Sequence, residues 1–373
     1  MNDPLQPETD QTYQFTPHYK KAKKIIIFAA VLIALSVIGG VYFLILSTKN
    51  QYALTSFTQI STFTPTSIPT PFPFRDITIP YLRERSYQSS LGDLEKISES
   101  GNYTSYVTNY DSDGLKISGL LTKPLGEMPS QGWPAIIFVH GYIPPKTYQT
   151  TSQYSDYVDY LARNGFVIFK IDLRGHGNSE GEPSGAYYSS DYIVDVLNAY
   201  NALESSPFVN PKKIGLWGHS MAGNVVLRSM ASKPTIPAVV IWAGAVYSYV
   251  DFREYGISDA SYQPPQMSSE RVRKRQQLLD TYGQPSEESF FWNQVAPTNY
   301  LSELKGAIQI HHAADDDVVD IAYSRNLISL LSKTSVPNEF HEYPQGGHNL
   351  TGSSFTLAMD NTIEFFRKYL DSK

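Results

Sequence analysis

The chain has 373 residues, of which 41% are hydrophobic and 18% charged, and this composition suits a large folded domain and argues against bulk disorder. Its formal net charge of −6 provides no broad basic field, so nucleic acid is a poor candidate partner. Because cysteine is absent, disulfides, thiolate zinc sites and cysteine nucleophiles are excluded.

The first part of the chain is expected to hold a membrane anchor. Ile25 to Leu46 is an uncharged run of 22 residues, which is the length that a helix needs to cross ~30 Å of hydrocarbon. The run is longer than a signal-peptide core and has no convincing cleavage site after it. Lysines are concentrated just before the run, so residues 1–24 are predicted to be a cytoplasmic tail, with the rest of the protein outside a single-pass cytoplasmic-membrane helix at 25–46.

Residues 47–75 are rich in Ser, Thr and Pro, a composition that favours an extended spacer over a packed core. From residue 76 to 373 the pattern changes to apolar runs of strand length that alternate with helical stretches. Such alternation is typical of βαβ units and predicts an α/β fold with a doubly wound, mostly parallel sheet.

The predicted strands and helices follow in chain order. Strands are expected at Lys116–Leu121, Ala135–Val139, Val167–Ile171, Ile214–Trp217, Val239–Trp242 and Ile308–His311. Helices are expected at Ser155–Asn164, Asp191–Leu203, Asn224–Ser232 and Phe355–Leu370. Residues 247–292 lack sheet-like runs and contain one polar helix candidate, Ser269–Tyr282, so they are interpreted as a helical cap inserted over the active site.

The strongest chemical signal is the segment Gly-His-Ser-Met-Ala-Gly that follows the predicted strand Ile214–Trp217 and precedes a helix. A sharp turn between a strand and a helix exposes a serine as a nucleophile, and small residues on either side let the two elements pack closely. Ser220 is therefore the predicted nucleophile. The segment departs from G-x-S-x-G, because Ala222 occupies the second glycine position and Gly223 follows it. The simpler alternative is a serine in an ordinary turn.

A serine nucleophile needs a general base and a carboxylate that orients the base, which follow it in the chain order Ser, acid, His. His348 lies in a glycine-containing loop just before the last predicted helix. It is favoured over His341, which lies inside the run Glu339–Tyr343, where a histidine in a strand is more often structural. The acid is expected among three consecutive aspartates, Asp315, Asp316 and Asp317, which spacing alone does not separate.

An oxyanion hole needs backbone N–H groups aimed at the developing negative charge. Met221, directly after the nucleophile, is expected to provide one. The other is expected from Tyr142, in the loop after the strand Ala135–Val139. His140 precedes the nucleophile in the chain and is interpreted as a residue that organises this loop.

Together these motifs resemble the α/β-hydrolase superfamily, and within it the catalytic domain of the prolyl oligopeptidase and dienelactone hydrolase-like branch, over roughly residues 106–370. The motifs that carry the resemblance are HGY at 140–142, DLRGHGNSEG at 172–181, GHSMAG at 218–223, HHAADDDVVDIAYS at 311–324 and GGH at 346–348. In that family a valine and a serine follow the acid at fixed spacings. Val319 and Ser324 then select Asp316, whereas a second register gives Asp315.

The resemblance implies hydrolysis of an ester or amide through a Ser220–His348–Asp316 triad and an acyl-enzyme, with no metal or organic cofactor. The short segment before the hydrolase region is too small for a propeller, which favours a small ester substrate over a peptide. A compact serine peptidase, an acyltransferase and a non-catalytic membrane-tethered binding protein are the alternatives.

Overall fold

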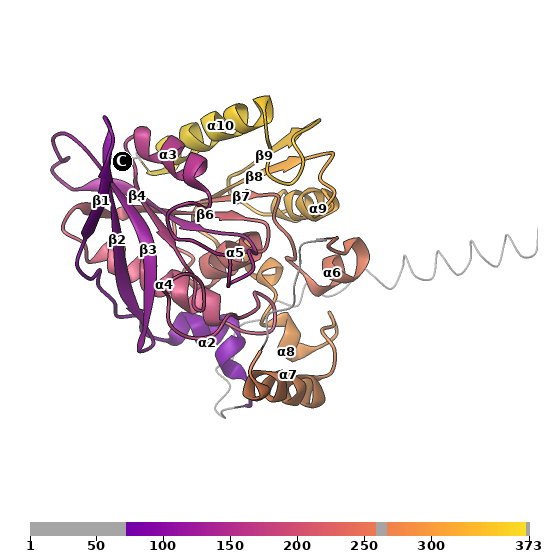
Figure 1. Ribbon diagram of the computed structural model, residues 1–373. Helices are drawn as coiled ribbons and strands as arrows, with labels where there is room; N and C mark the ends of the chain where they lie inside the picture. Colours follow the sequence, from indigo (N-terminus) through magenta and orange to yellow (C-terminus); the bar gives the residue numbers. More distant parts are fainter. Residues whose placement is uncertain (1–71, 259–266, 371–373) are drawn as a thin grey trace, which may run out of the picture. The chain divides into compact units, whose positions relative to one another are not determined.

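The computed structural model describes residues 72–258 and 267–370 (Figure 1). The predicted tail at 1–24, the predicted membrane helix at 25–46 and nearly all of the predicted spacer at 47–75 lie outside these residues. Among the helices in the described ranges, none combines the length and the apolar character that a membrane span requires.

A nine-stranded sheet in the order β1-β2-β3-β5-β4-β6-β7-β8-β9 forms the centre of the described part. Its strands are β1 (Glu95–Glu99), β2 (Tyr103–Ser112), β3 (Leu115–Pro124), β4 (Trp133–Val139), β5 (Val167–Ile171), β6 (Val209–His219), β7 (Ala238–Trp242), β8 (Ala307–Ala313) and β9 (Asn338–Tyr343). The strands from β5 to β9 in this order pair in parallel, and β1, β2 and β3 extend the sheet with antiparallel pairs.

Helices cover both faces of the sheet, as Figure 1 shows. The helical segments are η1 (Arg75–Ile77), α2 (Ile79–Glu84), α3 (Ser155–Arg163), α4 (Asp191–Glu204), α5 (Ala222–Ser232), α6 (Tyr249–Tyr255), α7 (Ser269–Tyr282), α8 (Phe290–Asn293), η2 (Pro297–Glu303), α9 (Ala322–Leu331) and α10 (Ser353–Leu370). Helices α3 and α10 share one hydrophobic core with the sheet, while α4, α5 and α9 share the other.

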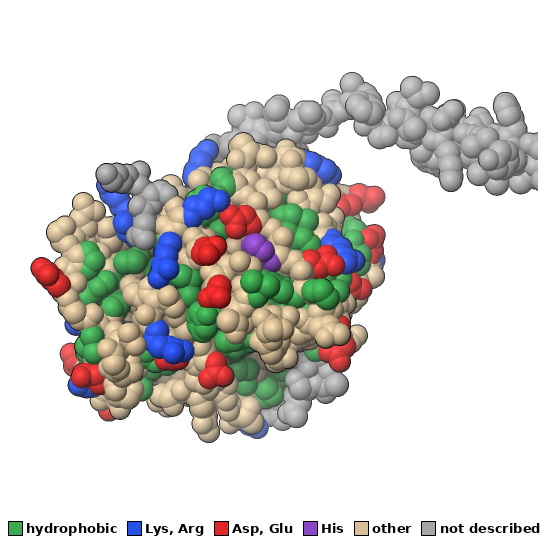
Figure 2. Space-filling model, turned by 90° about the horizontal axis from the view of Figure 1, so that it is seen from above, with side chains coloured by type: hydrophobic (Ala, Val, Ile, Leu, Met, Phe, Trp, Pro, Cys, Tyr) green, Lys and Arg blue, Asp and Glu red, His purple; other side chains and the backbone are tan. Residues whose placement is uncertain are grey.

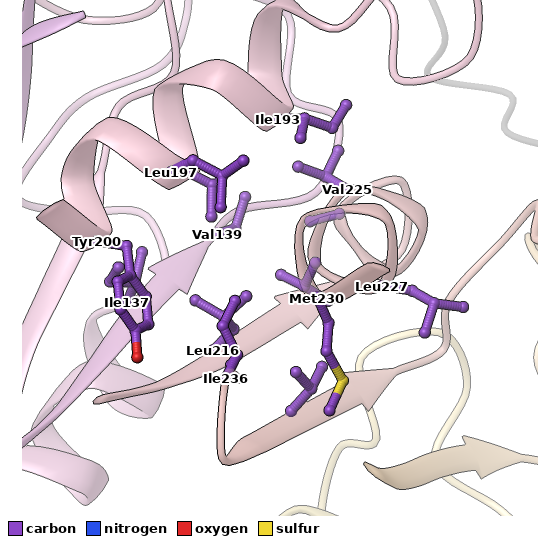
Figure 3. Close-up of a cluster of buried hydrophobic side chains, with 14 of the residues drawn as sticks. Ile137, Val139, Ile193, Leu197, Tyr200, Leu216, Val225, Leu227, Met230 and Ile236 are labelled. Atoms are coloured by element: carbon purple, nitrogen blue, oxygen red, sulfur yellow. The ribbon is translucent and has the colours of Figure 1, made fainter. Parts of the chain in front are cut away.

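The alternation of side chains along a strand divides the two cores. On β4, Ile137 and Val139 belong to the core under α4 and α5, whereas Ile136 and Phe138 belong to the core under α3 and α10. Because both faces are buried, the central strands read as continuous apolar runs. Figure 3 shows the first core, where side chains of α4 and α5 such as Leu197 and Val225 converge on β4 and β6.

The predicted doubly wound, mostly parallel sheet is confirmed, and each predicted strand overlaps an observed one. The structure adds β1 and β2, which the sequence reading did not propose. All residues of β1 are exposed, and β2 is built largely from Thr, Ser, Tyr and Asn, so neither carries the apolar run that marks the central strands.

The segment 247–292, interpreted as a cap, contains α6, α7 and most of α8, joined by non-helical residues; residues 259–266 lie outside the described ranges. Leu278, Phe291 and Trp292 of this segment form a small hydrophobic cluster with Ile77. Phe72, inside the predicted spacer, packs on the same cluster, with its ring centroid 6.2 Å from that of Phe291. The folded part therefore includes residues just before 76.

The face seen in Figure 2 carries Lys and Arg side chains interspersed with Asp and Glu. Charges of both signs alternate with apolar side chains over this part of the described surface. This distribution agrees with the modest net charge of −6 and differs from the single-sign surface that binds a phosphate backbone.

Candidate active site

Ser220 lies at the turn between β6 and α5, and its backbone has the left-handed angle φ of 56°, which is uncommon for a residue with a side chain. Its amide donates to the carbonyl of Trp242 at 2.9 Å, and its carbonyl accepts from the amide of Gly223 at 2.9 Å. These backbone bonds hold the turn in the strained conformation of a nucleophile elbow.

The glycines around Ser220 are needed for close packing. A Cβ atom on Gly218 would lie 2.7 Å from the carbonyl oxygen of Ala222, and one on Gly223 would lie 2.8 Å from Cα of Gly244. Ala222, by contrast, is accommodated as a fully buried residue. The requirement for glycine after the serine therefore falls on Gly223, and the departure from G-x-S-x-G at Ala222 leaves the turn intact.

His348 follows β9 and contacts the predicted acid. Its Nδ1 lies 2.8 Å from Oδ2 of Asp316, whose side chain is fully buried, while 15% of the His348 side chain is exposed. The loop of His348 also reaches the elbow, because Nε2 of His219 lies 2.9 Å from the His348 carbonyl oxygen and the two rings are 4.7 Å apart. Within the described residues no hydrogen bond joins Ser220 Oγ to the His348 ring, a bond that is often long in ligand-free enzymes.

The carboxylate of Asp316 is held by four donors. Oδ1 accepts from the amides of Val318 and Val319 at 2.9 and 3.0 Å. Oδ2 lies 3.1 Å from Nε2 of His312 in addition to its contact with His348. Burial alone would raise the pKa of Asp316, but the hydrogen bonds from His312 and His348 outweigh it and hold this pKa well below its usual range. The carboxylate therefore stays ionised and can orient the His348 ring.

The three consecutive aspartates have different surroundings. Asp315 is exposed, and its Oδ1 accepts from the Gly347 amide at 2.8 Å, which ties the two loops together. Asp317 is exposed. Of the three, Asp316 is the one that contacts the predicted base, His348. Asp315, which the second register selected, bonds instead to the backbone of Gly347 beside it.

His341, the competing base, lies on β9 away from these groups. Its ring stacks on His311 with centroids 5.0 Å apart, and its Nε2 lies 3.2 Å from Nε2 of Gln309. His140, which was interpreted as a loop organiser, is fully buried and contacts the Tyr148 ring in a tilted arrangement, with centroids 4.5 Å apart. Burial and the neighbouring His176 keep the pKa of His140 well below its ordinary value, so the ring is neutral.

The predicted oxyanion donors lie on the two sides of the elbow. Met221 precedes α5 as its N-cap, at the end of the helix where backbone N–H groups point outward and the helix dipole is positive. Tyr142 lies in the loop after β4, next to Gly141. A Cβ atom on Gly141 would lie 3.1 Å from Cβ of Ser220, so this loop lies directly against Ser220.

A buried polar cluster supports the loop that carries Tyr142. Lys170, with no exposed surface, donates to Tyr148 Oη at 3.1 Å, and this hydroxyl donates to Oδ1 of Asp172 at 2.7 Å. Thr150 donates to the other carboxylate oxygen of Asp172. Burial lowers the pKa of Lys170 to about 8 and raises that of Asp172 to about 6. A Cβ atom on Gly177 would come within 2.9 Å of this carboxylate.

The sequence reading gave no role to His219, His312, Tyr154 or the Lys170–Asp172 cluster. His312 and Asp172 lie inside the quoted motifs, and His219 immediately precedes Ser220. Their places in the sequence could therefore have marked them as candidates for the site. Their partners come from loops far away in the chain. In residues 72–258 and 267–370 no group of three or more His, Cys, Asp or Glu side chains is placed to hold a metal ion.

Part of the chain is similar to known hydrolases. Residues 133–266 match the protein-family profile described as serine aminopeptidase, S33. The uncharacterized peptidase YuxL of Bacillus subtilis is 23% identical over 266 residues, which are 69% of this chain and 37% of YuxL. The polyketide transferase claH of Penicillium crustosum is 30% identical over 32% of this chain and 37% of its own length. The chain thus spans little more than a third of these two curated relatives.

Two solved structures share the fold. The acetyl xylan esterase from Paenibacillus sp. R4 has a TM-score of 0.58 and 16% identity, with 78% of this chain and 92% of that chain covered. Dipeptidyl peptidase 4 of Porphyromonas gingivalis has a TM-score of 0.55 and 21% identity, with 72% of this chain and 36% of that chain covered. At this level of identity the similarity concerns the fold.

Proposed function

Since the chain belongs to the α/β-hydrolase superfamily of serine hydrolases, we propose that it cleaves esters of small carboxylic acids through a Ser220–His348–Asp316 triad. The observation that carries this proposal is the pairing of two features. Ser220 has a strained left-handed backbone at the turn into α5. His348 pairs with Asp316, and the His348 loop is hydrogen-bonded to His219, the residue before Ser220. This is the arrangement that activates a serine hydroxyl.

In the proposed reaction, the Nδ1–H of His348 donates a hydrogen bond to Asp316, which fixes the tautomer in which Nε2 is a base. Nε2 takes the proton of Ser220 Oγ while Oγ attacks the carbonyl carbon of the substrate. The amides of Met221 and Tyr142 stabilise the oxyanion of the tetrahedral intermediate. His348 then protonates the leaving alcohol, and water releases the acid from the acyl-enzyme by the same steps.

Similarity over nearly a whole esterase chain supports an ester substrate. The alignment covers 92% of the acetyl xylan esterase from Paenibacillus and 36% of the dipeptidyl peptidase. The described residues before β4 form η1, α2 and three antiparallel strands that extend the sheet. Since the three activating groups are retained, a purely binding role is disfavoured.

A compact serine peptidase is the second candidate. The matched family profile is described as a serine aminopeptidase, and YuxL is described as a peptidase. A panel of p-nitrophenyl esters and aminoacyl p-nitroanilides, assayed with the same preparation, separates the two. Turnover of the esters with no turnover of any aminoacyl p-nitroanilide supports the esterase, and turnover of an aminoacyl p-nitroanilide assigns the peptidase.

The membrane location is part of the proposal. The uncharged run at 25–46 and the lysines before it support a single-pass anchor in the cytoplasmic membrane, with the N-terminus inside and the hydrolase outside. Protease added to intact cells that carry a C-terminal epitope should remove the epitope. Complete protection, with degradation after the cells are lysed, would refute this topology.

A fluorophosphonate probe tests the nucleophile on the purified full-length protein in detergent. Wild type should be labelled and should hydrolyse p-nitrophenyl esters, and Ser220→Ala should do neither. Ser229→Ala, which removes a buried hydroxyl from the same helix α5, is a matched control and should keep both activities. Undiminished labelling of Ser220→Ala would overturn the proposal.

A further inference from the structure

Three hydrogen bonds in series connect the loop after β4, the elbow and the loop after β9. The amide of Gly141 donates to Tyr154 Oη at 3.0 Å. Tyr154 Oη lies 2.7 Å from Nδ1 of His219, and Nε2 of His219 lies 2.9 Å from the carbonyl oxygen of His348. Each of the three connected segments carries one part of the proposed site, and the series passes directly beside Ser220.

The groups at the two ends of the series determine which atom donates and which accepts in each hydrogen bond. The carbonyl oxygen of His348 only accepts, so Nε2 of His219 carries the proton. Burial, followed by the nearby His348, lowers the pKa of His219 to about 3, so the ring is neutral and its Nδ1 has no proton. Nδ1 therefore accepts from the hydroxyl of Tyr154. The Tyr154 oxygen in turn accepts from the Gly141 amide, and every group in the series has the partner that it needs.

The backbone around Tyr154 aims its hydroxyl at this point. Tyr154 precedes α3 as its N-cap with a φ of 60°, a conformation that is costly for an aromatic residue. Its ring packs on Phe138 and Tyr157, with centroids 5.3 and 5.4 Å away. A Cβ atom on Gly141 would meet Tyr154 Oη at 3.0 Å, so the contact also depends on this glycine.

We propose that Tyr154 and His219 are positioning residues that set the relative places of the Tyr142 amide, Ser220 Oγ and the His348 ring. This inference rests on the proposed function. Neither residue touches the substrate; both act through the segments that they join. Their neutral state matters as well, because a second positive charge beside His348 would oppose the protonation of that ring during catalysis.

The first test is Tyr154→Phe in the full-length protein, assayed with a p-nitrophenyl ester. This change removes the hydroxyl and keeps the ring that packs on Phe138. Since small misplacements in a catalytic site cost up to about 100-fold in rate, kcat is expected to fall about 10- to 100-fold, with KM changed by less than about threefold. Tyr160→Phe is the matched control, because Tyr160 lies on the same helix and its hydroxyl contacts only exposed Asp360; it should leave kcat unchanged.

The second test separates positioning from simple structural support. His219→Leu removes both ring nitrogens and should lower kcat in the same way. His219→Gln restores a donor and an acceptor, and it should recover part of that loss at an unchanged melting temperature. Fluorophosphonate labelling rates should follow kcat across these variants, since phosphonylation uses the same nucleophile and oxyanion hole.

The inference fails if wild type is active and Tyr154→Phe keeps its full kcat. It also fails if the losses of activity follow the melting temperature and His219→Gln recovers nothing. An inactive wild type, or a Ser220→Ala variant as active as wild type, would instead refute the proposed function on which the inference rests.

Discussion

The burial of Lys170 and Asp172 predicts how much unfolding free energy is lost when one of the two charges is removed. Both residues have no exposed surface, and Tyr148 Oη bridges them, 3.1 Å from Lys170 Nζ and 2.7 Å from Asp172 Oδ1. Asp172→Asn keeps the shape of the side chain and leaves the Lys170 ammonium without its buried anion. Breaking such a pair by removing one partner costs about 3–5 kcal/mol of unfolding free energy.

The double variant Lys170→Met, Asp172→Asn removes both charges and should recover much of that loss, because burial already acts against both charged forms. We expect a coupling free energy of at least about 2 kcal/mol in the double-mutant cycle. Urea unfolding of the full-length protein in detergent, followed by tryptophan fluorescence, measures it. The reasoning is refuted if Asp172→Asn stays within about 1 kcal/mol of wild type, or if the two single losses simply add.

The remaining predictions concern the elbow, the acid and a buried arginine. Gly223→Ala should destabilise the protein by about 1–3 kcal/mol and slow fluorophosphonate labelling, because the new Cβ meets backbone. Ala222→Gly should cost about 1 kcal/mol and stay active, and undiminished labelling of Gly223→Ala would contradict this account. Asp316→Asn should lower kcat by about 10⁴-fold. Since the folded pKa of Asp316 is depressed, its carboxylate stabilises the fold above the unfolded pKa of about 3.9 and this contribution is lost as pH falls through the folded value; the melting-temperature gap between wild type and variant should therefore shrink as pH falls below about 4, and a gap constant with pH would argue against it. Arg228→Met frees three backbone carbonyls that the guanidinium holds and should cost about 3 kcal/mol or more in urea unfolding, so a loss under about 1 kcal/mol would exclude this role.

The sequence predicted the central sheet because burial on both faces leaves a strong signal. Runs such as Ala135–Val139 and Val167–Ile171 are apolar throughout, and they correspond to β4 and β5. Strands β1 and β2 lack this signal, because water covers β1 and the residues of β2 that face the core are short or hydroxyl-bearing. β1 pairs with β2, and β2 pairs with β3 across the two-residue turn Asp113–Gly114. An Asp-Gly pair of this kind is a local hairpin signal, which was not used to predict the strands.

The candidate site could be predicted from the sequence where a motif and the chain order single out one residue. It could not be predicted where several residues of the same type are neighbours and only the path of the backbone separates them. Ser220 and His348 follow from motif and chain order. The three aspartates differ only in the path of one turn, which directs Asp316 to the base and Asp315 to the amide of Gly347. The neighbours of these residues were missed because a hydrogen bond between Tyr154 and His219 joins residues 65 positions apart in the chain.

Parallel strands bring the proposed groups to one edge of the sheet but do not fix the distances between them. Tyr142, Ser220, Asp316 and His348 each follow a different strand, and the loops that carry them leave the sheet independently. A reaction that depends on positions within a fraction of an ångström therefore needs contacts that cross from loop to loop. Backbone atoms provide several of these contacts, such as the bond from Gly347 to Asp315. Where the loops of Tyr142 and His348 meet the turn at Ser220, the side chains of Tyr154 and His219 provide such contacts. These contacts give the two polar side chains a structural reason to lie in an otherwise apolar interior.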